Sequence, residues 1–192
     1  DDILRNFCKG DERRAVTYRP WSVGDYSYAT DGTIIVRVPR LDDVPPPHDR
    51  TIEKTAAEID EWMARLADAN RVPVPRIELP TPKSWCCDTC DGRGTKHDCR
   101  SCDCECYDCD GTGRCQQPIV VAWRGAYIAG QLWKLIAELP GSTIVASPPS
   151  PPIYDHAGFA FDGGVGVVMA MRKPKDSDPL MVDAEPAATV AA

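Results

Sequence analysis

The sequence has no long hydrophobic run and comparatively little positive charge. No apolar segment approaches the roughly 18 to 20 residues that a membrane-spanning helix needs, and the opening DDILRNFCKG lacks the basic and then apolar pattern of a signal peptide. We therefore expect a cytoplasmic protein with no membrane partner. Its 22 lysines and arginines are outnumbered by 29 aspartates and glutamates, which disfavours broad affinity for nucleic-acid phosphates.

Motifs of common enzyme classes are also missing. The chain has no phosphate loop ending in Gly-Lys-Ser/Thr and no Gly-x-Ser-x-Gly nucleophile turn. His156 follows Asp155 closely enough for acid-base work, but neighbours on a loop are more often solvated than catalytic. The sequence predicts that the protein is not an enzyme.

Cysteine, by contrast, is abundant and concentrated. Nine of the ten cysteines lie in residues 86–115, CCDTCDGRGTKHDCRSCDCECYDCDGTGRC. Secreted disulfide scaffolds scatter their cysteines to connect distant segments, so this clustering favours a metal site. A Cys-x-x-Cys turn places two sulfurs on one side, and two such turns supply the four thiolates that tetrahedral zinc prefers.

Two of these turns share a glycine pattern, in CDTCDGRG and CYDCDGTG. Glycine allows the backbone to take a positive φ and to turn close to the sulfurs. The repeated Cys-x-x-Cys-x-Gly-x-Gly resembles the central zinc domain of the DnaJ chaperone family, whose first and last repeats share one zinc. The resemblance implies a first zinc site formed by Cys87, Cys90, Cys106 and Cys109.

A second zinc site is an open alternative. Cys99 and Cys102 form an inner repeat that lacks the glycines of the family pattern. Two of four further residues would have to complete the site: Cys104, Cys115, Cys86 or His97. Without a second ion, the remaining cysteines of the cluster are spare thiols beside a single zinc. We expect one zinc ion, with room for two.

The rest of the chain predicts an α+β fold. Strand-like YSYAT and TIIVRV are joined through Asp31-Gly32, which suits a tight hairpin. The run TIEKTAAEIDEWMARLADAN carries an apolar helix face made of Ile52, Ala56, Ile59, Met63 and Leu66, widened by Trp62. After the cysteines, IVVAW predicts a strand, AGQLWKLIAEL a helix that stops at Pro140-Gly141, and STIVAS, GFAF and VGVVMAMR three strands.

The two outer segments share an order of helix and strands, which indicates a duplicated helix-plus-antiparallel-strand body. YATDGTIIVRV resembles the strand-turn-strand of bacterial sliding clamps, and the LPG…FDGG ending with a cysteine-rich insert is similar to bacteriophage proteins. The predicted organisation has four parts: residues 1–82 as the N-terminal half with a linker helix, 83–118 as the zinc insert, 119–172 as the C-terminal half, and 173–192 as a flexible tail.

Charge and these resemblances lead to two functional hypotheses. The segment from Lys83 to Pro118 contains seven acidic and five basic residues. A four-thiolate zinc site adds about two more negative charges. We therefore prefer a non-enzymatic zinc-binding protein-interaction module, a phage factor acting on host machinery in the host cytoplasm. The alternative is a clamp-like accessory protein of DNA replication or repair, which would contact DNA through Arg13, Arg14, Arg19 and Arg37.

Chaperone and redox activities are less favoured. DnaJ proteins that have all the domains of the family recruit their ATPase through a His-Pro-Asp motif. This chain has PPPHDR instead, and it has no Gly/Phe-rich linker. Thiol-disulfide exchange needs a lowered thiol pKa, and the mostly acidic surroundings oppose it. The chain has one clamp-like domain, whereas a closed ring resembling a clamp needs six. The sequence therefore leaves the oligomeric state open.

Overall fold

The structure is a computed structural model that describes residues 2–8, 15–47, 50–67, 70–96, 104–145, 156–171 and 179–184. Its largest element is a seven-stranded, wholly antiparallel sheet with the order β1-β2-β3-β13-β12-β11-β4. The strand bounds are β1 Trp21–Val23, β2 Tyr26–Thr30, β3 Ile34–Pro39, β4 Arg71–Pro73, β11 Thr143–Val145, β12 His156–Phe161 and β13 Gly164–Met169. With few helices and mainly antiparallel strands, the fold is α+β, as the sequence predicts.

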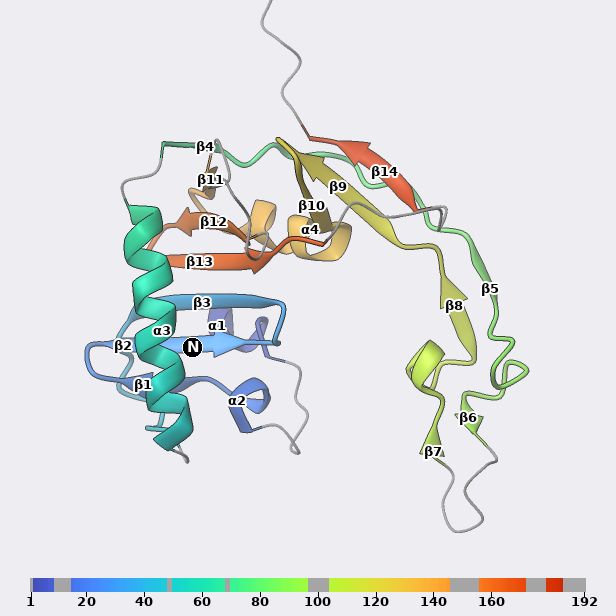
Figure 1. Ribbon diagram of the computed structural model, residues 1–192, viewed down its shortest axis with the longest axis horizontal. Coiled ribbons are helices and arrows are strands. Elements are labelled where there is room, and N and C mark those ends of the chain that lie inside the picture. The colour runs from blue at the N-terminus through green and yellow to red at the C-terminus, as the bar shows by residue number, and fades with distance from the viewer. Residues whose placement is uncertain are drawn as a thin grey trace, which may run out of the picture.

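Two similar halves meet where β3 pairs with β13 (Figure 1). In the first half, α1 (Asp2–Arg5) and the short α2 (Ala15–Tyr18) precede β1, β2 and β3; in the second, α4 (Gly130–Glu138) precedes β11, β12 and β13. Each set of three strands runs from an outer position to the centre of the sheet. Antiparallel neighbours need only short turns, so consecutive strands in each half become neighbours in the sheet.

The hairpin between β2 and β3 shows how local sequence produces one of these turns. The Asp31 carboxylate accepts hydrogen bonds from the backbone N–H groups of Thr33 (2.7 Å) and Ile34 (3.0 Å). Gly32 has a φ of 92°, a conformation that costs little without a Cβ. The predicted Asp-Gly turn is therefore confirmed.

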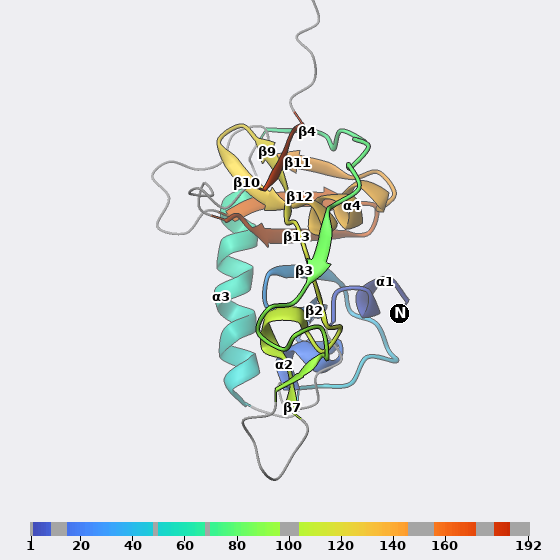
Figure 2. The same cartoon turned by 90° about the vertical axis from the view of Figure 1, so that its right-hand side faces the viewer.

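One face of the large sheet is covered by α3 (Arg50–Ala67), seen on one side of the strands in Figure 2. Four of the five residues predicted for its apolar face are at most 4% exposed and pack against β1, β2 and β13: Ile52, Ala56, Ile59 and Met63. The side chain of Leu66 lies outside the described residues. Trp62 does not widen the buried face, because it is 39% exposed and lies at the rim beside His156.

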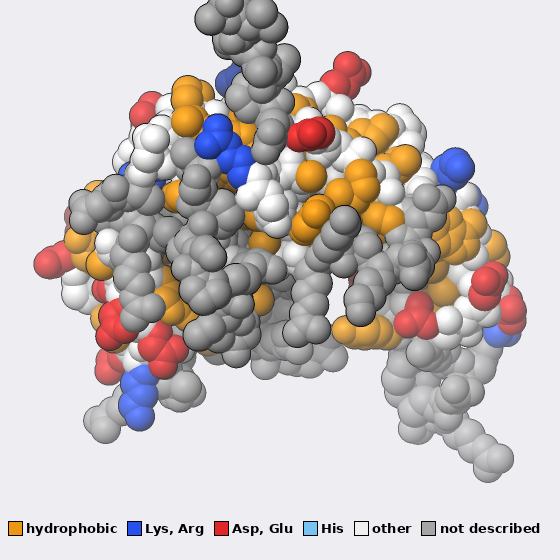
Figure 3. All heavy atoms as spheres, turned by 45° about the horizontal axis from the view of Figure 1, so that its top comes forward, with side chains coloured by type: hydrophobic (Ala, Val, Ile, Leu, Met, Phe, Trp, Pro, Cys, Tyr) orange, Lys and Arg blue, Asp and Glu red, His pale blue; other side chains and the backbone are white. Residues whose placement is uncertain are grey.

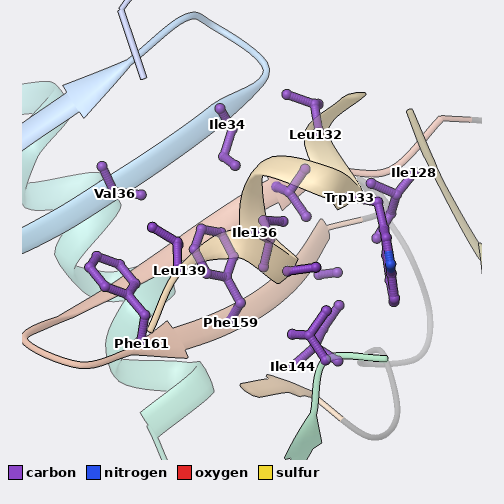
Figure 4. Packing of buried hydrophobic residues seen from close by; sticks show 14 of the residues in the cluster. Ile34, Val36, Ile128, Leu132, Trp133, Ile136, Leu139, Ile144, Phe159 and Phe161 are labelled. Atoms are coloured by element: carbon purple, nitrogen blue, oxygen red, sulfur yellow. The ribbon is translucent and has the colours of Figure 1, made fainter. Parts of the chain in front are cut away.

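The other face carries α1, α4 and a second sheet with the order β10-β9-β14. These strands are β9 Ile119–Trp123, β10 Ala126–Ala129 and β14 Leu180–Asp183. Figure 4 shows side chains of α4 meeting those of β3, β12 and β11 in one core, where Trp133, Ile136 and Phe159 are at most 1% exposed. The described parts of the chain contain no helix that is long and apolar enough to cross a membrane.

The C-terminal segment differs from the predicted flexible tail. Leu180–Asp183 form β14, which pairs in parallel with Ile119–Ala122 of β9, and Ala184 is buried. The edge of β9 has backbone N–H and C=O groups that need hydrogen-bond partners, and β14 supplies them. The strand forms there although its sequence shows little apolar pattern. The segments 172–178 and 185–192 lie outside the described residues.

The cysteine-rich segment forms a narrow arm, which we define as residues 84–96 and 104–116. β5 (Ser84–Cys86) pairs with β8 (Arg114–Gln116), and β6 (Thr95–Lys96) pairs with β7 (Cys104–Glu105). A single 3-10 turn, η1 (Tyr107–Cys109), follows β7. Figure 1 shows the arm extending from the body, with β8 leading back to β9.

Candidate metal centre

Four cysteines of the arm converge on one point. Cys87 and Cys90 follow β5, whereas Cys106 precedes η1 and Cys109 is its last residue. All four are at most 6% exposed, and their Sγ atoms lie within 4.8 Å of one another. The Sγ atoms of Cys87 and Cys106 are 3.9 Å apart, and those of Cys90 and Cys109 are 3.7 Å apart. Sulfurs about 2.3 Å from a tetrahedral zinc stand about 3.8 Å from each other, so the geometry fits one such ion.

The two cysteine turns have the same backbone structure. In the first turn, the Gly92 N–H donates to the Cys87 carbonyl oxygen (3.1 Å), and the Gly94 N–H points at the Cys90 sulfur (3.3 Å). The second turn repeats both bonds at the same lengths, from Gly111 to Cys106 and from Gly113 to Cys109. An N–H directed at a sulfur stabilises the thiolate that a metal requires.

The glycines also allow the two turns to interlock. Gly94 and Gly113 have φ values of 78° and 74°, which residues with a Cβ rarely adopt. A Cβ on Gly94 would collide with the Gly111 carbonyl oxygen, and a Cβ on Gly113 would collide with that of Gly92. The sequence repeat is therefore required by close approach of the turns as well as by their φ angles.

Backbone hydrogen bonds hold the turns together across the site. The Cys87 N–H donates to the Gly113 carbonyl oxygen (3.0 Å), and the Cys106 N–H donates to that of Gly94 (2.7 Å). Each turn thus supports the first cysteine of the other. This reciprocal arrangement brings together four sulfurs that come from two segments of the chain.

The thiols of the cluster do not ionise alike. Burial raises the pKa of Cys87, but hydrogen bonds from the backbone N–H groups of Cys90 and Thr89 outweigh it and bring the pKa to about 7. Burial and the neighbouring thiols raise the pKa of Cys109 to about 12. Four thiolates cannot easily be held together without a cation, and a bound metal ion supplies that compensating charge.

The remaining predicted ligands are not assembled into a second cluster among the described residues. Cys115 is half-buried, packs against the four cysteines and directs its thiol at the Asp108 carbonyl oxygen (3.6 Å). Cys86 is exposed. It directly follows Trp85, the cross-strand partner of Cys115, and successive strand residues point to opposite faces, so Cys86 faces away from Cys115. The side chain of Cys104 and all of Cys99, Cys102 and His97 lie outside the described residues, so the second zinc remains a prediction.

The arm has almost no apolar core apart from these thiols. Its buried cluster contains Cys87, Cys90, Cys106 and Cys109, with Cys115 packed beside them. No aliphatic or aromatic side chain in the described part of the arm is buried. A bound metal would therefore replace the hydrophobic core that so short a segment cannot build.

Sequence reasoning missed two exposed aromatic residues of the arm. Trp85 in β5 is 46% exposed, and Tyr107 in η1 is 86% exposed. Tyr107 stands between two cysteines of a Cys-x-x-Cys turn, where the backbone curves around the sulfurs and the intervening side chains point outward. That position is the signal from which its exposure could have been predicted.

Of the four arginines predicted for DNA contact, two lie within the described residues, Arg19 and Arg37. The Arg37 guanidinium donates to the Asp60 carboxylate (2.7 Å) and lies over the Tyr26 ring. It is thus engaged within the fold. Arg19 lines a cavity with Arg5 near the start of β1, and Arg13 and Arg14 lie outside the described residues.

A cavity of about 340 Å³ lies between α3 and the large sheet. Its lining is almost entirely apolar, with Ile35, Ile59 and Val167 among the contributing residues, and its described titratable side chains are Glu58 and His156. The pairing of His156 with Asp155 that the sequence suggests falls on a residue outside the described ranges. Instead, the His156 ring lies 5.2 Å from the Trp62 ring.

Comparison with protein-family models, with curated proteins and with solved structures finds no match. The resemblances to the DnaJ zinc domain, to sliding clamps and to bacteriophage proteins therefore stay predictions made from the residues. What the structure establishes is an α+β fold with mainly antiparallel sheets. To this it adds four buried cysteines positioned to hold a metal ion.

Proposed function

We propose that the protein is a non-enzymatic zinc-binding protein whose arm is an interaction module for another protein. The observation that carries this proposal is the buried set of four converging cysteines in an arm with little other core. Four protein ligands close the coordination sphere of zinc and leave no position for a reacting water. Zinc at this site would stabilise structure rather than perform chemistry.

The ligand set supports zinc over other common metals. Magnesium and calcium prefer oxygen ligands, whereas a tetrahedral set of four thiolates is typical of zinc or of iron. The two backbone N–H groups directed at the sulfurs of Cys90 and Cys109 suit either of these. Metal analysis decides between them, because a ferric tetrathiolate is coloured and the zinc form is not.

The position and charge of the arm support a protein partner. The arm extends away from both core clusters of the body (Figure 1). Its acidic side chains lie beside hydrophobic ones at the right of Figure 3. A zinc tetrathiolate adds negative charge there, and such a surface repels nucleic-acid phosphates. The finer hypothesis, a bacteriophage factor acting on host machinery in the host cytoplasm, is supported by sequence resemblance alone.

Native mass spectrometry and metal analysis of freshly reduced protein test the metal part. We expect one zinc per chain in the wild type and none bound stably in Cys109→Ser. Cys86→Ser is the matched control, because Cys86 is exposed and lies outside the cluster; it should keep its zinc. A wild type without stoichiometric metal would overturn the proposal, whereas two zincs would assign the second to the inner cysteines.

Crosslinking mass spectrometry tests the interaction part. A photoreactive residue placed at Asp88, which is exposed on the arm, should form crosslinks to a specific protein in wild type but not in Cys109→Ser. A photoreactive residue at Glu58 on α3 serves as the position control. Two results would instead favour the clamp-like alternative: DNA binding by the protein that weakens steeply as salt rises, or a closed symmetric oligomer in native mass spectra.

A further inference from the structure

The arm exposes aromatic surface that its own structure does not use. Tyr107 is 86% exposed and Trp85 is 46% exposed, although large aromatic side chains usually bury most of their area. Exposed tyrosine and tryptophan are enriched where proteins contact partners. In the arm they stand next to the proposed zinc site, which would hold the backbone beneath them rigid.

The two aromatic residues come from elements that pack on the same side of the arm. Trp85 in β5 is the cross-strand partner of Cys115 in β8, and directly opposed residues point to one face of a two-stranded sheet. The Cys115 thiol on that face reaches the Asp108 carbonyl oxygen in η1, at 3.6 Å. Trp85 therefore lies on the face against which η1 packs, and Tyr107 is the residue preceding Asp108 in η1.

Both arginines of the described arm are engaged elsewhere. On the opposite face of the β5–β8 pair, the Arg114 guanidinium donates to the Ser84 hydroxyl (3.0 Å). The Arg93 guanidinium donates to the Cys90 carbonyl oxygen (3.1 Å) and pairs with Asp91 (3.3 Å). Neither cation neutralises the side that carries the aromatic residues.

Several carboxylates of the arm have no cationic partner among the described residues: Asp88, Glu105, Asp108 and Asp110. Asp108 directly follows Tyr107 within η1, and Asp110 is the first residue after η1. A zinc tetrathiolate beneath η1 would add about two negative charges. Among the described residues, this side of the arm thus combines two exposed aromatic rings with an excess of negative charge.

We infer that this face of the arm binds a lysine- and arginine-rich segment of the protein partner, with the basic side chains on Trp85 and Tyr107 and their charge facing Asp108 and Asp110. Ammonium and guanidinium groups are attracted both to aromatic faces and to carboxylates. Nucleotide bases also stack on exposed aromatic residues, but a backbone of phosphates would be repelled here. The inference rests on the proposed function, because it names the partner class for that zinc-supported arm.

Fluorescence anisotropy with the full-length, zinc-loaded protein tests this inference. The probes are a labelled decapeptide of alternating lysine and glycine, its glutamate counterpart and a single-stranded deoxynucleotide decamer. We expect the lysine peptide alone to bind, with affinity falling as salt rises. Trp85→Ala/Tyr107→Ala should weaken binding at least tenfold, and Asp108→Asn/Asp110→Asn should weaken it about fivefold.

Matched controls separate this surface from general acidity and from misfolding. Trp62→Ala removes a comparably exposed tryptophan from α3 and should leave peptide binding unchanged. Zinc content is measured for every variant, so that an arm that has lost its metal is recognised; Trp85→Phe/Tyr107→Phe keeps the π faces and should restore most of the affinity.

Three results would overturn the inference: no binding of the lysine peptide, equal binding by the double alanine variant, or binding of the decamer that depends on Trp85 and Tyr107. Such a failure differs from failure of the proposed function. If the protein carries stoichiometric zinc and the arm crosslinks to a protein, the interaction module stands and only the basic partner class is wrong. If the wild type carries no metal, the proposed function itself is wrong.

Discussion

The sulfur atoms of Cys90 and Cys109 lie 3.7 Å apart, although 19 positions separate them in the sequence. Each sulfur faces the N–H of the glycine four residues later, Gly94 or Gly113, at 3.3 Å. The same glycines carry the carbonyl groups that bond the first cysteine of the opposite turn. The metal ligands and the interlocked backbone are therefore one unit, and a change in either should be felt in the other.

Gly94→Ala should lower the affinity for zinc at least tenfold. The new Cβ would collide with the Gly111 carbonyl oxygen, and the φ of 78° would itself cost about 1–2 kcal/mol. Competition with a chromogenic chelator measures the affinity. Gly125→Ala is the control, since Gly125 has a φ of 88° but open space where a Cβ would be. Equal zinc affinity in the two variants would contradict the interlocked structure.

Removal of metal with a chelator should unfold the arm and leave the body folded. The buried cluster of the arm is made of thiols, whereas both apolar clusters belong to the body. In nuclear magnetic resonance spectra, the Trp85 indole signal should shift. The Trp123 and Trp133 signals should stay, because their indole N–H groups bond the carbonyl oxygens of Val145 (3.0 Å) and Pro75 (3.1 Å). Simultaneous loss of all three signals would show that the body depends on the metal.

The protein should lose stability at alkaline pH partly through Tyr28. Burial, followed by the hydrogen bond to Asp60, raises the pKa of Tyr28 above its usual value. Above about pH 10 the unfolded chain ionises this phenol while the folded chain keeps it neutral, so the free energy of unfolding falls as pH rises. Below that pH, both states hold the proton and the effect vanishes.

Urea unfolding at about pH 8 and about pH 11 measures this effect. Between the two pH values, the free energy of unfolding of Tyr28→Phe should fall less than that of the wild type. At about pH 8 the variant should be the less stable of the two, because it lacks the hydrogen bond to Asp60 (2.9 Å). Tyr107→Phe is the control, because Tyr107 is 86% exposed. A wild-type decline matched by Tyr28→Phe would place the alkaline sensitivity elsewhere.

Truncation after position 178 should destabilise the body by about 2 kcal/mol, since it removes β14 from the edge of β9. The Leu180 N–H donates to the Pro118 carbonyl oxygen and the Ala184 N–H to that of Ala122, each at 3.0 Å. Thermal and urea unfolding measure the loss. Truncation after Ala184 keeps the strand and should match the full chain; equal stability of both truncations would show that β14 contributes nothing.

Much of the structure follows from short-range features of the sequence. The Asp31-Gly32 turn, the apolar face of α3 and the stop of α4 before Pro140 were all predictable, because each depends on residues within a few positions of one another. The cysteine turns belong to the same category. Their spacing and glycines indicated metal-binding turns, and the resemblance to the DnaJ zinc domain implied which four thiols converge. The structure confirms that convergence for Cys87, Cys90, Cys106 and Cys109.

Tertiary structure decided what spacing could not. The pairing of β14 with β9 joins segments about sixty residues apart, and it depends on an available strand edge rather than on a strong local pattern. Trp62 lies at the rim of α3, and Cys115 packs against the cysteine cluster. Neither position follows from local spacing, because the burial of a side chain depends on the elements that pack against it. The sequence by itself determined the turns, through local backbone chemistry, and placed the candidate metal-binding cysteines in them. Only the folded chain decided which edges, faces and aromatic side chains stay exposed, because exposure depends on contacts between distant segments.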